Sequence, residues 1–163
     1  MINCLYAIAL ALVAFFTRAT GRRLAGALVG GAAVSVIALG ADALGEELGW
    51  WRMAIWGLYL PLVYVSFVVS LAPIYLVTWR VARKFGWRGL AVGVLVLTVI
   101  GPPRDYMYVA RFPEWASYAP GVVPVLAIAT LYAIVVPLGH SMMRLVAGPA
   151  KADRLARRPW ESA

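Results

Sequence analysis

The feature that most constrains this chain is an apolar stretch, residues 53–79, without one charged side chain. About 20 helical residues, each rising roughly 1.5 Å, cross a hydrocarbon core of about 30 Å, and this stretch is long enough to do so. Four other stretches qualify or nearly do: 2–17 and 121–143, which hold no Asp, Glu, Lys or Arg, 24–45, which contains only Asp42, and 89–112, which is apolar as far as Pro103. Because backbone polar groups in lipid must be hydrogen-bonded within the span, a helix is the expected form. The sequence therefore predicts an all-α integral membrane protein, a bundle of five transmembrane helices.

The composition agrees with lipid as the surrounding solvent. Charged residues make up 13% of the chain and hydrophobic residues 63%, whereas an average soluble domain is roughly 25% charged. The formal net charge is +8, but the basic residues lie between apolar stretches, which argues against a nucleic-acid partner. Cys4 is the only cysteine and His140 the only histidine, so an internal disulfide and a Cys or His cluster for metal are excluded. We expect neither a bound metal ion nor a cofactor.

Lys and Arg residues are concentrated in three of the segments that follow predicted spans. Twelve of the fifteen lie there: Arg18, Arg22, Arg23, Arg80, Arg83, Lys84, Arg88, Arg144, Lys151, Arg154, Arg157 and Arg158. Cytoplasmic segments of membrane proteins carry such an excess. The sequence therefore predicts an N-terminus outside and a C-terminus in the cytoplasm, with 1–147 as the membrane domain and 148–163 as a short cytoplasmic tail. The expected location is the cell membrane, as a multi-pass protein, and specifically a bacterial inner membrane.

A few charged residues lie at the outer ends of the predicted spans, where such groups are usually paired or functional. Asp42 and Glu46 are four residues apart and share one face of the second predicted helix. Arg104 and Asp105 occupy the far end of the fourth predicted span. Helical rise places Arg104 and Asp42 at similar depth. We therefore expect an ion pair between Arg104 and either Asp42 or Glu46.

The Gly101-Pro102-Pro103 sequence allows two extents for the fourth predicted span. Proline lacks a backbone N–H and disfavours a helix interior. In one interpretation the helix continues past the prolines to residue 112, with the freed carbonyls facing protein or a water-filled cavity. In the other, the helix ends at Gly101 and an outer loop follows. The sequence leaves both open.

Two further patterns concern helix packing and the lone histidine. The Gly26-x-x-x-Gly30 and Gly89-x-x-x-Gly93 spacings provide small surfaces for close helix contact within the chain. His140 is four residues before Arg144, so it is expected near the cytoplasmic headgroups as an interfacial histidine.

The outer polar cluster has two interpretations. It is either a structural clasp between the second and fourth helices, or a site for chemistry or binding. In the second case Asp42, Glu46 and Asp105 would perform acid/base steps, while Arg104 would orient a carboxylate or supply charge.

The leading functional hypothesis is a non-catalytic integral membrane protein, either a subunit of a larger membrane assembly or a lipid-binding scaffold. The alternative is a membrane-embedded enzyme that acts on a lipid or isoprenoid at the outer interface, through Asp42, Glu46, Arg104 and Asp105. A small-solute transporter is the third possibility. The expected partners are membrane lipids and another membrane protein.

Overall fold

The computed structural model describes residues 2–54 and 60–150, and within them the chain is mainly helical, with two short strands and short connecting turns. The elements in order are α1 (Ile2–Thr17), α2 (Gly21–Glu47), β1 (Trp51–Met53), α3 (Leu60–Arg111), β2 (Ala116–Tyr118) and α4 (Val122–Ala147). The all-helical architecture is confirmed, but the two strands were not expected. The predicted tail lies outside the described residues beyond residue 150, and so do residues 55–59 of the predicted span 53–79.

Three helices, α2, α3 and α4, are long and apolar enough to cross a membrane, and α1 is a shorter apolar helix. Large apolar side chains stand exposed on these helices, among them Phe15, Val99 and Leu145. An exposed apolar surface of this extent is unfavourable in water and suits contact with lipid. The chain therefore has the character of a membrane protein.

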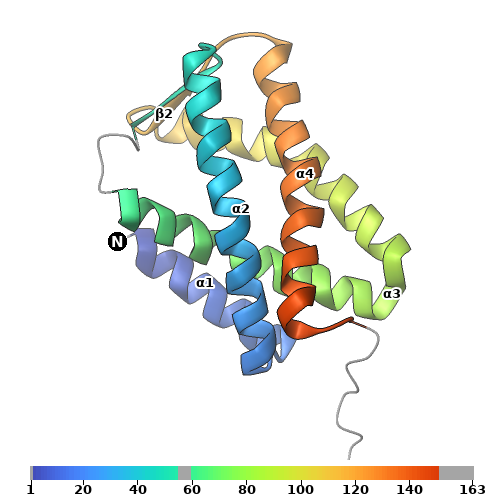
Figure 1. Cartoon of the computed structure of the whole chain (residues 1–163). Coiled ribbons are helices and arrows are strands. Elements are labelled where there is room, and N and C mark those ends of the chain that lie inside the picture. The colour runs from blue at the N-terminus through green and yellow to red at the C-terminus, as the bar shows by residue number, and fades with distance from the viewer. Residues whose placement is uncertain (1, 55–59, 151–163) are drawn as a thin grey trace, which may run out of the picture.

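The α3 helix reverses direction at Gly86, which divides it into two arms, residues 60–85 (the first arm) and 87–111 (the second arm). Gly86 has φ 68°, a left-handed conformation in which glycine carries no steric penalty. In Figure 1 the two arms diverge from this point, and α1 lies along the first arm. The strands lie at one end of the bundle, here called the strand end. The end that holds Gly86 and the last turn of α4 is called the Gly86 end.

The second arm continues through Pro102 and Pro103 to Arg111, so the continuous-helix interpretation is confirmed. The two prolines cannot donate to the carbonyls of Thr98 and Val99, as a regular helix requires. The helix is held at this point by packing, because Gly101 and Pro102 are both buried.

Helices α2 and α4 pack closely through glycine. A side chain at Gly26 would meet the carbonyl oxygen of Met143 at 2.9 Å, and one at Gly30 would collide with the backbone of Gly139. The first glycine pair therefore serves contact within the chain, as expected. In the second pair only Gly89 makes a close contact, because a Cβ there would meet Phe85 and Val81 of the first arm across the reversal at Gly86, whereas a Cβ added at Gly93 would have no atom within 4 Å.

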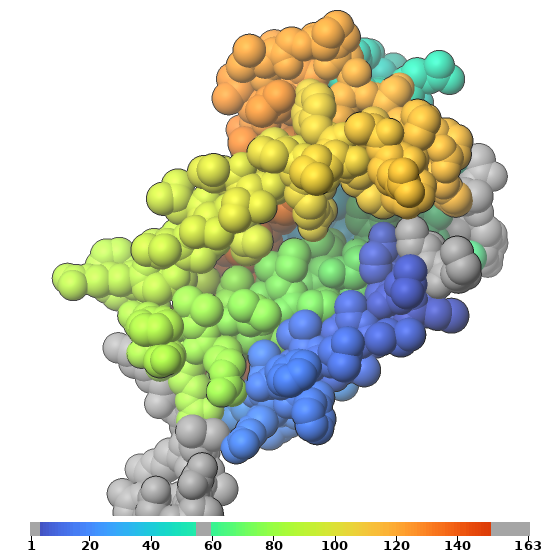
Figure 2. Space-filling model, turned by 180° about the vertical axis from the view of Figure 1, so that it is seen from behind, coloured from blue at the N-terminus to red at the C-terminus, as the bar shows by residue number. Residues whose placement is uncertain are grey.

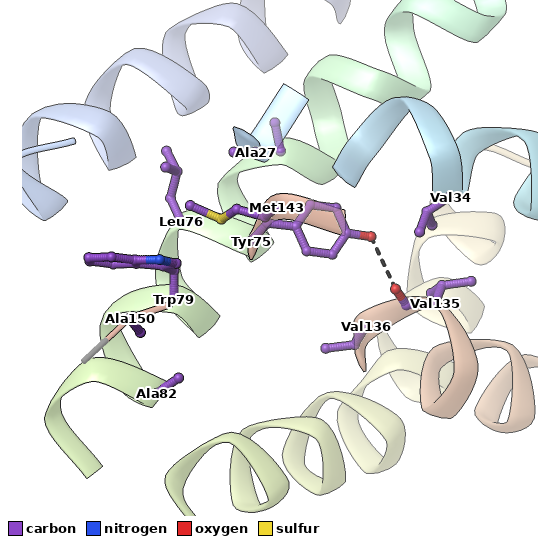
Figure 3. Close-up of a cluster of buried hydrophobic side chains, with 11 residues drawn as sticks. Ala27, Val34, Tyr75, Leu76, Trp79, Ala82, Val135, Val136, Met143 and Ala150 are labelled. Carbon is purple, nitrogen blue, oxygen red and sulfur yellow. Dashed lines mark hydrogen bonds between the residues drawn. The ribbon is translucent and has the colours of Figure 1, made fainter. Parts of the chain in front are cut away.

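The core lies between these helices and the first arm, around Tyr75 (Figure 3). The Tyr75 side chain is fully buried, and its hydroxyl donates to the carbonyl of Val135 at 3.3 Å. One turn further along, Thr78 Oγ1 donates to the Tyr75 carbonyl at 3.1 Å and lies 3.2 Å from His140 Nδ1. With the Thr78 proton on the Tyr75 carbonyl, Thr78 Oγ1 accepts from the His140 tautomer that carries its proton on Nδ1.

The structure shows that His140 is buried against protein, with the residue only 3% exposed. It lies on α4, which continues to Ala147, and contacts Thr78 of the first arm. Its position near the cytoplasmic headgroups stays a prediction.

Candidate functional site

The strand pair is fixed to the end of α2 by Trp51. The strands are antiparallel, with Trp51 opposite Tyr118. The Trp51 indole N–H donates to the backbone carbonyl of Asp42 at 2.9 Å, and a Cβ at Gly45 would overlap the indole ring. The rings of Trp51 and Tyr118 pack edge to face, 6.1 Å between centroids. The absence of a side chain at Gly45 thus allows the Trp51 ring, and with it the Tyr118 ring, to lie beside Asp42.

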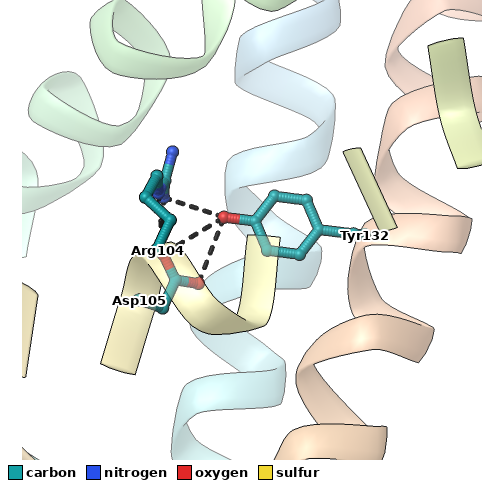
Figure 4. Close-up of polar contacts among 3 residues, drawn as sticks. All are labelled: Arg104, Asp105 and Tyr132. Atoms are coloured by element: carbon teal, nitrogen blue, oxygen red, sulfur yellow. Dashed lines mark hydrogen bonds and ion pairs between the residues drawn. The ribbon is translucent and has the colours of Figure 1, made fainter. Parts of the chain in front are cut away.

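A second polar group joins the second arm to α4 (Figure 4). Arg104 Nη2 lies 2.6 Å from Asp105 Oδ1, and Arg104 Nε donates to the same oxygen at 3.0 Å. The Tyr132 hydroxyl accepts from Arg104 Nη2 at 2.8 Å and donates to Asp105 Oδ2 at 3.1 Å. A Cβ at Gly101 would overlap the Tyr132 ring, so the glycine before the prolines allows this close approach. Charge-assisted bonds of this kind are stronger than neutral ones.

Between these two groups lies a cavity of about 200 Å³, bounded by α2, both arms of α3, the two strands and α4. Its lining is mainly apolar, with a small number of polar side chains. The polar members are Asp42, Ser70, Arg104, Asp105, Tyr118 and Tyr132. Figure 2 shows a furrow between the two arms from the outside, with atoms of α2 and α4 at its floor. An apolar cavity with a few convergent polar groups is typical of a ligand-binding site.

The structure brings together three of the four predicted site residues. Asp42, Arg104 and Asp105 all line the cavity. Glu46 does not, because it borders a separate surface pocket with Arg52 and Glu114.

The predicted ion pair of Arg104 with Asp42 or Glu46 is wrong, because Arg104 pairs with its neighbour Asp105. Arg104 and Asp42 do line one cavity, but the packing of the second arm on Tyr132 turns Arg104 toward Asp105.

Asp42 stands out for its lack of a protein partner. Its residue is 9% exposed, yet within residues 2–54 and 60–150 no side chain forms a hydrogen bond or ion pair with its carboxyl group. A buried carboxyl group without a partner is costly, and such groups in proteins are ordinarily satisfied. The Asp42 carboxyl is therefore open to a partner, water or a ligand, that enters from the cavity.

Tyr118 lies outside the long helices and supplies a neutral phenol to the cavity. Burial raises the pKa of the Tyr118 hydroxyl, and the nearby carboxyl groups of Asp105 and Asp42 raise it further. The phenol therefore stays protonated near neutral pH. Both carboxyl groups thus affect the pKa of the Tyr118 hydroxyl, as expected for three residues that line one cavity.

Sequence reasoning missed Tyr118 and Tyr132 as site residues. Tyr132 carried a usable signal, because it is the one tyrosine in the otherwise uncharged stretch 121–143, and polar groups at such positions ordinarily contact a partner.

Comparison of the chain with protein-family models, with curated proteins and with solved structures found no match.

Proposed function

We propose that the chain crosses the membrane five times, with the two arms of α3 as separate spans, the N-terminus outside and the C-terminus in the cytoplasm. The reversal at Gly86 supports this count. The described acidic residues lie beside the strands or at the adjoining end of α2: Asp42, Glu46, Glu47, Asp105 and Glu114. Basic residues flank the Gly86 end, so the Gly86 end is cytoplasmic under the positive-inside rule. The location we propose is the cell membrane, specifically a bacterial inner membrane.

We propose that the protein binds an amphipathic membrane lipid in the cavity at the strand end, as a lipid-binding scaffold or subunit of a membrane assembly. The observation that carries this proposal is the unpartnered Asp42 carboxyl in a cavity with largely apolar walls. The furrow between the two arms gives a lipid chain lateral access, and Asp42, Arg104 and Asp105 receive its polar end. In the topology proposed above, the strand end faces the outside, so the cavity would lie at the level of the lipid headgroups of the outer leaflet.

The core supports binding over transport of a small solute. Tyr75 fills the space between α2 and α4 on the side of the cavity toward Gly86, in contact with Gly30 and Gly139. A solute path through the bundle would have to displace this ring. An acid/base enzyme acting on a lipid or isoprenoid is the second candidate, favoured by two carboxyl groups, Asp42 and Asp105, in one cavity.

The test is to fill the cavity and measure the lipid that copurifies. Ala38 lines the cavity, whereas Ala43 on the same helix is exposed on its outer face. Ala38→Phe should reduce the lipid retained per protein through a detergent wash, measured by mass spectrometry, and Ala43→Phe should not. Ser70→Leu provides a second, smaller change in the lining. Equal lipid retention in the wild type and both lining variants, all monodisperse, would contradict the proposal.

A further inference from the structure

We propose that the cavity selects a phospholipid whose headgroup carries a primary ammonium, that is, a phosphoethanolamine head, with the ammonium on Asp42 and the phosphate on Arg104. This inference rests on the lipid-binding function proposed above and names its ligand class. It follows from the charge, the exposure and the size of the cavity.

The charges of the cavity favour a cationic group inside it. The lining contains two carboxyl groups, Asp42 and Asp105, and one guanidinium, Arg104. Arg104 and Asp105 satisfy each other at 2.6 Å. Asp42 has no ion-pair partner among the described side chains. A buried carboxylate is stabilised by an opposite charge that also donates hydrogen bonds. An anionic headgroup would add a second negative charge beside it, which is unfavourable.

The exposure of the charged residues gives the headgroup an orientation. The Asp42 residue is 9% exposed, whereas the Arg104 side chain is 65% exposed. The carboxyl group thus lies inside the cavity and the guanidinium at its mouth. Arg104 uses Nε and Nη2 for Asp105 and Tyr132, and within the described residues nothing accepts from Nη1. A phosphate at the mouth fits that remaining pair of N–H donors.

The partners available to the inner group favour a primary ammonium over a trimethylammonium. A primary ammonium has three N–H donors, and the Asp42 carboxylate accepts charge-assisted bonds from them. Tyr118, which lines the same cavity, adds phenol lone pairs as a further acceptor. A trimethylammonium group donates no N–H bond and would leave Asp42 without a hydrogen-bond donor.

The size of the cavity separates the headgroup from the acyl chains. At about 200 Å³ the cavity is smaller than the roughly 300–1,000 Å³ that is usual for a site enclosing a whole drug-sized ligand. It therefore holds the headgroup, while the chains lie in the furrow between the arms of α3 (Figure 2). This arrangement leaves most of the lipid in contact with the bilayer.

The experiment compares three phospholipids with identical acyl chains on the purified full-length protein. Delipidated protein in detergent is titrated with phosphatidylethanolamine, phosphatidylcholine and phosphatidylglycerol, and binding is followed by native mass spectrometry. We expect phosphatidylethanolamine to bind about tenfold more tightly than phosphatidylglycerol, the difference expected for one charge-assisted contact. Asp42→Asn should abolish this preference. Glu47→Gln removes the same charge from the exposed end of the same helix and should leave the preference unchanged.

The outcomes separate the headgroup assignment from the proposed function. Equal binding of the three lipids, or preference for phosphatidylglycerol or phosphatidylcholine, would overturn the headgroup assignment and leave lipid binding in place. No binding of any lipid beyond the level of Ala38→Phe would overturn the proposed function itself. If Asp42→Asn does not fold, the wild-type comparison among the three headgroups still decides the question. Arg104→Gln, at the exposed mouth, should weaken phosphatidylethanolamine more than diacylglycerol, and equal weakening would count against the phosphate contact.

Discussion

The two ends of the bundle use the same device, an aromatic ring set against glycine, with different results. Toward the Gly86 end, Tyr75 fills the notches left by Gly30 and Gly139, and the core around it is closed. At the strand end, Trp51 packs on Gly45 and Tyr132 on Gly101, and both rings line the cavity. The same kind of contact seals one region and frames an opening in the other. In the core a single ring fills the space between the glycines, whereas at the strand end two rings border a space that neither of them fills.

Polar groups show the same contrast between the two ends. In the closed core, Thr78 and His140 bond each other and the Thr78 hydroxyl also bonds the backbone. In the cavity, Arg104, Asp105 and Tyr132 are mutually satisfied, but Asp42 is not. The Trp79 indole N–H in the closed core also lacks a hydrogen-bond partner among the described residues, but it is neutral, and a buried carboxyl group costs more to leave unpaired. We therefore expect changes in the closed core to lower the free energy of unfolding. We expect removal of the unpaired Asp42 charge from the cavity to leave that free energy unchanged or to raise it.

The largest effect is expected from Gly139→Val. The valine would overlap the Tyr75 ring and push α4 away from α2, and overpacking of a close contact costs about 1–3 kcal/mol, occasionally more. The melting temperature in detergent should fall steeply. Gly40→Val is the matched control, because no atom lies within 4 Å of a Cβ at Gly40. Similar melting temperatures for the two variants would show that the Tyr75 contact does not govern stability.

An intermediate effect is expected from Thr78→Val. This change removes the acceptor of the buried His140 N–H, and an unsatisfied buried donor costs about 1–3 kcal/mol. Thr98→Val is the control, because the Thr98 hydroxyl is buried without a hydrogen-bond partner in the described part of the chain. Thermal unfolding should show a loss for Thr78→Val and none for Thr98→Val. An equal loss in both would mean that the change in shape, and not the hydrogen bond, is responsible.

Hydropathy predicted most of the helical elements because lipid imposes a length and a composition on every span. Residues 2–17 form α1 as predicted, and the stretch 121–143 lies almost wholly within α4. The predicted fourth span ends one residue beyond Arg111. Hydropathy could not predict where the third span begins, because Met53 belongs to a strand whose partner is far away in sequence.

The site was predicted only in part, for a geometric reason. Helical rise gives the depth of a residue, and it predicted a similar level for Arg104 and Asp42, which both line the cavity. Rotation of the helix about its axis decides which neighbour a side chain reaches. Here that rotation depends on the contact of Gly101 with Tyr132, a contact between distant positions that no local pattern records.

The smallest effect, and the one with the opposite sign, is expected from Asp42→Asn in lipid-free protein. The change removes a buried carboxyl group that has no partner among the described side chains, so stability should be unchanged or rise by about 1 kcal/mol. Asparagine has nearly the same shape, which keeps the packing against Trp51 and Tyr118. Thermal unfolding of delipidated protein measures the effect, with Glu47→Gln as the exposed control on the same helix. A drop like that of Thr78→Val would mean that Asp42 is a satisfied structural group, and the two ends of the bundle would then no longer differ in kind. Phosphatidylethanolamine should stabilise the wild type but not Asp42→Asn. If the lipid-free variant is also more stable than the lipid-free wild type, the unpaired carboxyl lowers stability and serves binding.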